Sequence, residues 1–171
     1  RDLHSFPTRR SSDLGKEMAF AANAQHWTVL DVTDPTDVSM VGYSNYASSG
    51  DVHQCWLSED HRFLFLGDEL DEMNFGNTTR TLIWNVEDLD NPVLIGEHLA
   101  ETPSIDHNQY VQGNLLFQSN YTAGLRILAL DNVADGELEE VAHFDVYPSN
   151  DNANFHGAWS VYPFLPSGLV L

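Results

Sequence analysis

The chain has 171 residues, the length of one ordinary domain with a sizeable buried core. It contains 26 acidic and 7 basic residues, and the net charge of −19 argues against nucleic acid and anionic membrane surfaces as partners. No apolar run reaches the roughly 18 residues of a membrane span. The single cysteine, Cys55, excludes an internal disulfide and a cysteine-rich zinc site, and we expect it to be a buried apolar residue of a strand.

The first 14 residues differ in composition from the rest of the chain. They hold three of the seven basic residues and lack the apolar segment of a secretory signal. The segment is similar to a translated sequencing adapter. We therefore interpret residues 1–14 as a non-native or disordered leader and begin the fold at Gly15.

From Gly15 onwards, short β-rich runs alternate with turns. Acidic turns end at Pro35 and Pro92, and no stretch of helix length shows a 3.6-residue period. A flexible loop is expected over residues 74–79, and a further unit begins at Phe155. Strands are predicted over residues 18–22, 27–32, 39–46, 52–57, 62–66, 81–86, 93–99, 105–111, 115–120, 125–130 and 138–146.

These runs repeat with a period near 50 residues. His53, His107 and His156 begin successive units, 54 (107 − 53) and 49 (156 − 107) residues apart, and each precedes an aromatic residue by three positions. Four short strands in each repeat are typical of a β-propeller blade, whereas a β-sandwich lacks this internal register. We predict an all-β fold, an incomplete β-propeller of about three four-stranded antiparallel blades. Its units are predicted at about 15–50, 51–103, 104–150 and 151–171.

Several segments resemble a known family. Residues 30–35, Leu-Asp-Val-Thr-Asp-Pro, resemble an LVIVD repeat, and residues 106–110, 118–127 and 156–168 are similar to the choice-of-anchor B family. The resemblance extends over residues 17–171. It implies an exported, extracellular bacterial protein that is held at the cell surface. The family has no assigned activity, so the resemblance implies no catalytic residues. A whole family member has a signal, an anchor and more blades, so we expect this chain to be a fragment whose partners include the remaining blades.

The repeated histidines are the first candidate site. In a propeller the innermost strands line a central channel, so His53, His107 and His156 are expected to belong to a ring, with Asn108 and Asn120 on the same channel face. Imidazole side chains suit zinc, copper or iron. The alternative is that each histidine bonds a neighbouring blade and serves packing alone.

An acidic loop after the second strand of its blade is the second candidate. Asp68 and Glu69, followed by Asp71 and Glu72, offer carboxylates that could form an oxygen-rich calcium site with Asn74 or Asn120, although the spacing is not that of an EF-hand. We favour the alternative, a solvated acidic loop.

No nucleophile elbow and no phosphate-binding glycine loop is present in the sequence, so we assign no catalytic residue. We favour a non-catalytic, surface-exposed binding or scaffold module over an enzyme, with a protein, glycan or small molecule as its ligand. The alternative is a metal-dependent hydrolase, with calcium or zinc, that uses the central channel face.

Overall fold

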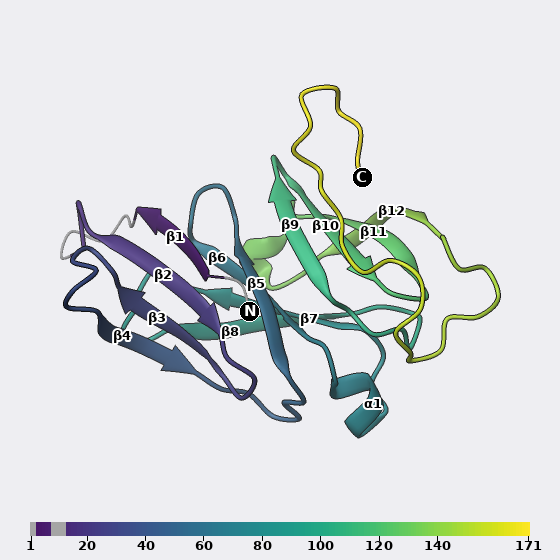
Figure 1. Cartoon of the computed structure of the whole chain (residues 1–171), viewed down its shortest axis with the longest axis horizontal. Coiled ribbons are helices and arrows are strands. Elements are labelled where there is room, and N and C mark those ends of the chain that lie inside the picture. The colour runs from purple at the N-terminus through teal and green to yellow at the C-terminus, as the bar shows by residue number, and fades with distance from the viewer. Residues whose placement is uncertain (1–2, 8–12) are drawn as a thin grey trace.

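The computed structural model describes residues 3–7 and 13–171 and arranges them in three four-stranded antiparallel sheets (Figure 1). The first sheet consists of β1 (Leu3–Pro7), β2 (Glu17–Ala22), β3 (Trp27–Asp31) and β4 (Ser39–Ser44). The second consists of β5 (Val52–Leu57), β6 (Phe63–Asp68), β7 (Arg80–Asn85) and β8 (Val93–Leu99). The third consists of β9 (Asn108–Gln112), β10 (Leu115–Asn120), β11 (Gly124–Ala129) and β12 (Glu139–Phe144).

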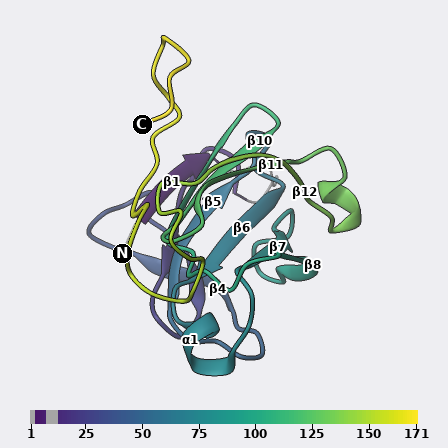
Figure 2. The same ribbon diagram turned by 90° about the vertical axis from the view of Figure 1, so that its right-hand side faces the viewer.

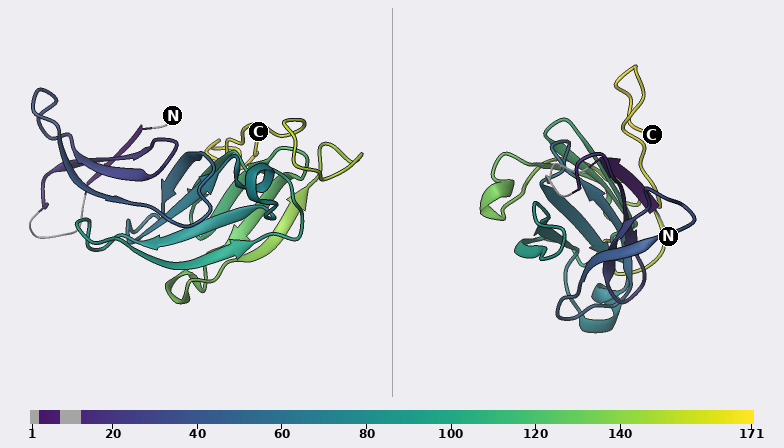
Figure 3. Two further views of the ribbon diagram at one scale, coloured as in Figure 1. Left: turned by 90° about the horizontal axis from the view of Figure 1, so that it is seen from below. Right: turned by 90° about the vertical axis from the view of Figure 1, so that its left-hand side faces the viewer.

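Each sheet is a meander, because strands that follow one another along the chain pair side by side. Figure 3 shows the first sheet at one end of the molecule, the second in the middle and the third at the other end. Strand β5 packs against β9 of the next sheet and against β2 of the preceding one. This architecture is that of successive propeller blades and confirms the predicted fold class.

The three sheets share a local irregularity in strand pairing. In every sheet the register between the third and fourth strands shifts at the same place. Beyond the shift, Gly96 of β8 lies so close to the backbone of Gly136 in the next blade that a side chain would collide with it. Gly42 of β4 meets the backbone of Leu89 in the same way. A glycine at this position therefore lets neighbouring blades approach closely.

Two apolar clusters fill the spaces between the sheets. Strand β6 is buried along its whole length, and its side chains alternate between the clusters. Leu64 and Leu66 join Trp27 and Trp84 between the first and second sheets, whereas Phe65 joins a cluster with the third sheet. A strand buried on both faces reads as a continuous apolar run, which is why Phe-Leu-Phe-Leu shows no polar alternation. Cys55 is buried in the first cluster, as expected.

The acidic loop differs from its prediction. Asp71–Phe75 form a short helix, α1, which ends at the left-handed Gly76, whose N–H donates to the Glu72 carbonyl. One turn is too short to display a helical period, so the sequence offered no sign of it. Asp68, Asp71 and Glu72 are buried, so the expectation of a solvated acidic loop is wrong.

The two ends of the chain differ in how far they join the sheets. Leu3–Pro7 pair along β2, while residues 1–2 and 8–12 lie outside the described residues, so the interpretation of residues 1–14 as a foreign leader stays a prediction. Residues 145–171 follow an irregular path with one isolated bridge, Tyr121 to Ala158, where a further unit was expected. Figure 2 shows the C-terminal end of this segment extending away from the sheets. No helix among the described residues is long and apolar enough to cross a membrane.

Candidate functional site

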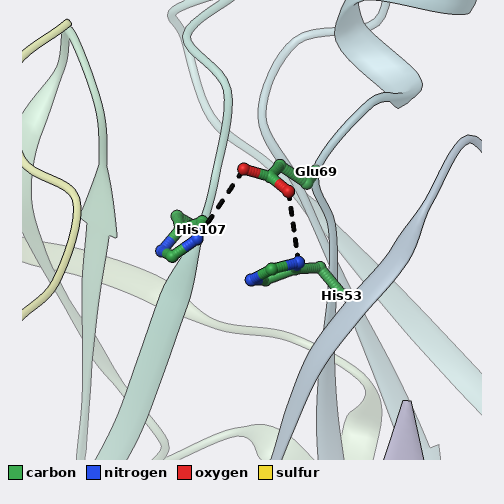
Figure 4. Close-up of side chains that lie close together, drawn as sticks. All are labelled: His53, Glu69 and His107. Atoms are coloured by element: carbon green, nitrogen blue, oxygen red, sulfur yellow. Dashed lines mark ion pairs between the residues drawn. The ribbon is translucent and has the colours of Figure 1, made fainter. Parts of the chain in front are cut away.

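Three polar side chains meet where the second and third sheets adjoin (Figure 4). His53 lies on β5, Glu69 directly follows β6, and His107 directly precedes β9. Backbone hydrogen bonds hold two of these positions, because the Glu69 N–H donates to the Asp51 carbonyl and the His107 N–H to the Ser119 carbonyl. The side chains therefore project from ordered strand ends rather than from loose loops.

The Glu69 carboxylate lies between the two imidazoles. One oxygen, Oε2, is 3.1 Å from His53 Nδ1, and the other, Oε1, is 3.7 Å from His107 Nε2. The two rings are 4.3 Å apart between centroids. One ligand atom from each residue lies within 4.8 Å of the other two. Two imidazoles and one carboxylate are a set that binds zinc or iron in proteins.

The tautomer of His107 follows from its neighbours. His107 Nδ1 lies 2.5 Å from the carbonyl oxygen of Trp159, which can only accept, so Nδ1 carries a proton. In the neutral ring Nε2 then presents a lone pair toward the Glu69 carboxylate. The Nε2 lone pair and the carboxylate oxygen repel each other unless a proton or a cation lies between them. A backbone carbonyl on the far nitrogen is also the usual support of a metal-binding histidine.

Tyr121, which sequence reasoning missed, completes the surroundings of Glu69. Its hydroxyl donates a hydrogen bond of 2.7 Å to Glu69 Oε1. Burial, followed by the neighbouring Glu69, raises the pKa of Tyr121 above its ordinary value, so the hydroxyl stays a donor. Tyr121 follows the predicted residue Asn120, but its direction depends on a positive φ of 29°, which no sequence pattern indicated.

The other predicted residues lie in different surroundings. His156 is exposed, stacks on Tyr147 and contacts Asn154, and it does not belong to either metal-capable group found among the described residues. Asn108 donates to Ser160 Oγ at 3.3 Å. Asn120 is buried, and its side-chain oxygen has no hydrogen-bond partner within the described part of the chain.

Asp68 has a structural environment although it adjoins Glu69. Its two oxygens accept hydrogen bonds from the Tyr46 hydroxyl and from three backbone N–H groups, at 2.6–3.3 Å. The donors come from residues 50, 51 and 70, so Asp68 joins the segment before β5 to the end of β6. The predicted pair therefore divides: Glu69 faces the histidines, and Asp68 holds the backbone.

Comparison with known proteins identifies the fold. No family model matches the chain, and no curated protein matches it. Among solved structures, the chain is similar to a periplasmic gluconolactonase from Pseudomonas aeruginosa, with a TM-score of 0.65 and 16% sequence identity. The match covers 96% of this chain and 47% of that one, so the chain spans about half the length of that protein. At this identity the likeness shows the shared β-propeller fold.

Proposed function

We propose that His53, Glu69 and His107 bind a divalent transition metal, zinc by preference, and that the protein is a metal-dependent hydrolase acting at this end of the blades. The observation that carries the proposal is the position of Glu69 between two imidazoles, one of them fixed by the Trp159 carbonyl. The gluconolactonase with the same fold supports a cyclic ester as the substrate class. Nitrogen ligands favour zinc over calcium at this particular group.

The side chains of this chain have distinct tasks in such a reaction. The Trp159 carbonyl holds the His107 ring so that Nε2 faces the centre, and Tyr121 orients the Glu69 carboxylate through its hydrogen bond. A zinc ion bound here would lower the pKa of a water molecule to about 7 and so supply a nucleophile at neutral pH. The exposed Trp159 ring, stacked on His107, forms one wall against which a small substrate packs.

A second candidate is the non-catalytic binding module favoured by the sequence. The observation that supports it is a pair of exposed aromatic side chains beside the histidine group: Trp159 stacks on His107, and Phe155 contacts Tyr121. Large aromatic faces in contact with water are suited to stacking on sugars or on a protein partner. For either function, the resemblance to the choice-of-anchor B family supports export to the cell surface, and that membership stays a prediction.

Metal content measured by elemental mass spectrometry, before and after chelation, tests the proposal. We expect stoichiometric zinc in the protein and in H156A, a matched control at an exposed histidine, and loss of zinc in H53A and H107A. A protein without bound metal contradicts the proposed site. If zinc binds but the intact protein hydrolyses no lactone, the result favours the second candidate, a non-catalytic binding module.

A further inference from the structure

A second cluster of charged side chains lies beside the histidine group. Asp71 and Glu72 belong to α1, and Asp106 immediately precedes His107. All three are buried, with exposed fractions of 0%, 4% and 4%. One carboxylate oxygen from each residue lies within 4.8 Å of the other two. Residues 35 positions apart in the chain (106 − 71) thus place three acidic groups in one enclosed space.

Most oxygens of this cluster are unsatisfied. Asp71 Oδ1, both Glu72 carboxylate oxygens and Asp106 Oδ1 are buried without a hydrogen-bond partner in the described part of the chain. The remaining Asp71 oxygen accepts from Arg80 Nε at 2.7 Å and from Asn77 Nδ2 at 3.2 Å. Buried carboxylate oxygens are rarely left in this way, because each loses its hydration without compensation.

The charge balance leads to the same conclusion. Arg80 is the basic residue paired with the cluster, through Asp71, so three carboxylates face one positive charge. Burial and the mutual repulsion of neighbouring carboxylates both oppose leaving all three groups ionised without further compensation. Something must neutralise the cluster, either bound protons or a cation.

The geometry favours a cation. A proton shared between two carboxyl groups satisfies one oxygen of each, whereas a cation can contact an oxygen from all three residues at once. Calcium takes oxygen ligands at about 2.3–2.6 Å, so oxygens within 4.8 Å of one another fit inside a single calcium sphere. Waters and carbonyl groups complete the remaining positions in many calcium sites. The cluster contains no nitrogen ligand, in contrast to the histidine group.

We propose that Asp71, Glu72 and Asp106 form a calcium site that joins α1 to the start of β9. The ion neutralises the excess negative charge and draws α1 toward the segment that carries His107. It therefore holds the neighbouring histidine group in place from behind. This site does not depend on the proposed hydrolase function, since its ligands and its ion differ from those of the histidine group.

The test combines calcium titration calorimetry with thermal melts of the full chain in calcium and in chelator. We expect one bound calcium ion and a higher melting temperature in calcium than in chelator. E72Q should bind calcium roughly 10- to 100-fold more weakly, because one charged ligand is lost. E101Q, at an exposed glutamate, is the matched control and should behave as the unaltered protein does.

The unaltered protein and E72Q should also exchange their order of thermal stability between chelator and calcium. In chelator, E72Q should melt at a higher temperature than the unaltered protein, because a buried glutamine is neutral without a bound proton or cation. In calcium the order should reverse. D106N should show the same crossing, which protects the conclusion if one variant folds poorly. The proposal is overturned if the unaltered protein binds no calcium, or if E72Q and D106N bind it as tightly as E101Q does.

Discussion

At the scale of single residues, the chemistry of the histidine group depends on neighbours that are remote in sequence. The Trp159 carbonyl accepts a hydrogen bond from His107 Nδ1–H, and the Tyr121 hydroxyl donates one to an oxygen of Glu69. Both partners lie 52 residues from the groups that they hold. Small changes at these supporting positions should therefore alter metal binding more than folding.

Y121F should weaken zinc binding roughly 10-fold or more, the usual effect of removing a group that orients a metal ligand. The free energy of unfolding should fall by only about 1 kcal/mol, the typical value of one hydrogen bond. Zinc titration of the variant, beside Y162F as a control at an exposed tyrosine, measures the difference. Equal affinities in both variants would show that Tyr121 does not support the metal site.

At the scale of elements, the end of β6 determines how the acidic residues are distributed. Gly67 lies against the Asp106 carboxylate, so closely that a side chain at position 67 would occupy the place of Asp106 Oδ2. The glycine thus makes room for a carboxylate that comes from the next blade. This contact explains why a glycine follows the four apolar residues of β6.

G67A should lower the free energy of unfolding by about 1–3 kcal/mol, the cost of an extra methyl group in a packed interior. It should also abolish calcium-dependent stabilisation, because Asp106 is displaced. Chemical denaturation with and without calcium measures both effects. The double variant G67A/D106A is the control, because removal of the carboxylate makes space for the methyl group. Its loss in free energy of unfolding should be smaller than the sum of the losses in G67A and D106A. Full additivity would disprove the steric explanation.

At the scale of the whole molecule, the three sheets depend on one another for burial. The second sheet contributes side chains to both apolar clusters, whereas the third sheet exposes Val141 and Phe144 on β12. Blades of repeat proteins gain much of their stability from contacts with neighbours. Exposed apolar side chains on an outer strand also favour association between molecules.

The 171-residue chain should therefore melt over a broad temperature range, and its apparent mass should increase with concentration. Calorimetry and light scattering over a concentration series measure these properties. V141K/F144K should reduce the association, since charges on an outer strand oppose pairing between sheets. A sharp, cooperative melt of a monomer at all concentrations would contradict this expectation.

Much of the blade architecture could be predicted because its signals are local. The alternation of side chains and turn residues such as Pro35 and Pro92 act over a few positions. The histidines recur at a nearly fixed interval. The strand over 115–120, for example, was expected where β10 is found. Helix α1 and the irregular path of residues 145–171 were not expected, because one turn has no period and an apolar run becomes a strand only beside a partner.

The sequence by itself determined the all-β repeat and placed His53, His107 and Glu69 among the candidates, since residue type and spacing suffice for that. Only the tertiary structure decided that Glu69 rather than Asp68 faces the histidines, because backbone N–H groups from another segment bind both Asp68 oxygens. It also decided that Asp106 joins Asp71 and Glu72 in a buried cluster. Such encounters arise from the packing of adjacent blades, which depends on contacts between distant residues rather than on local pattern.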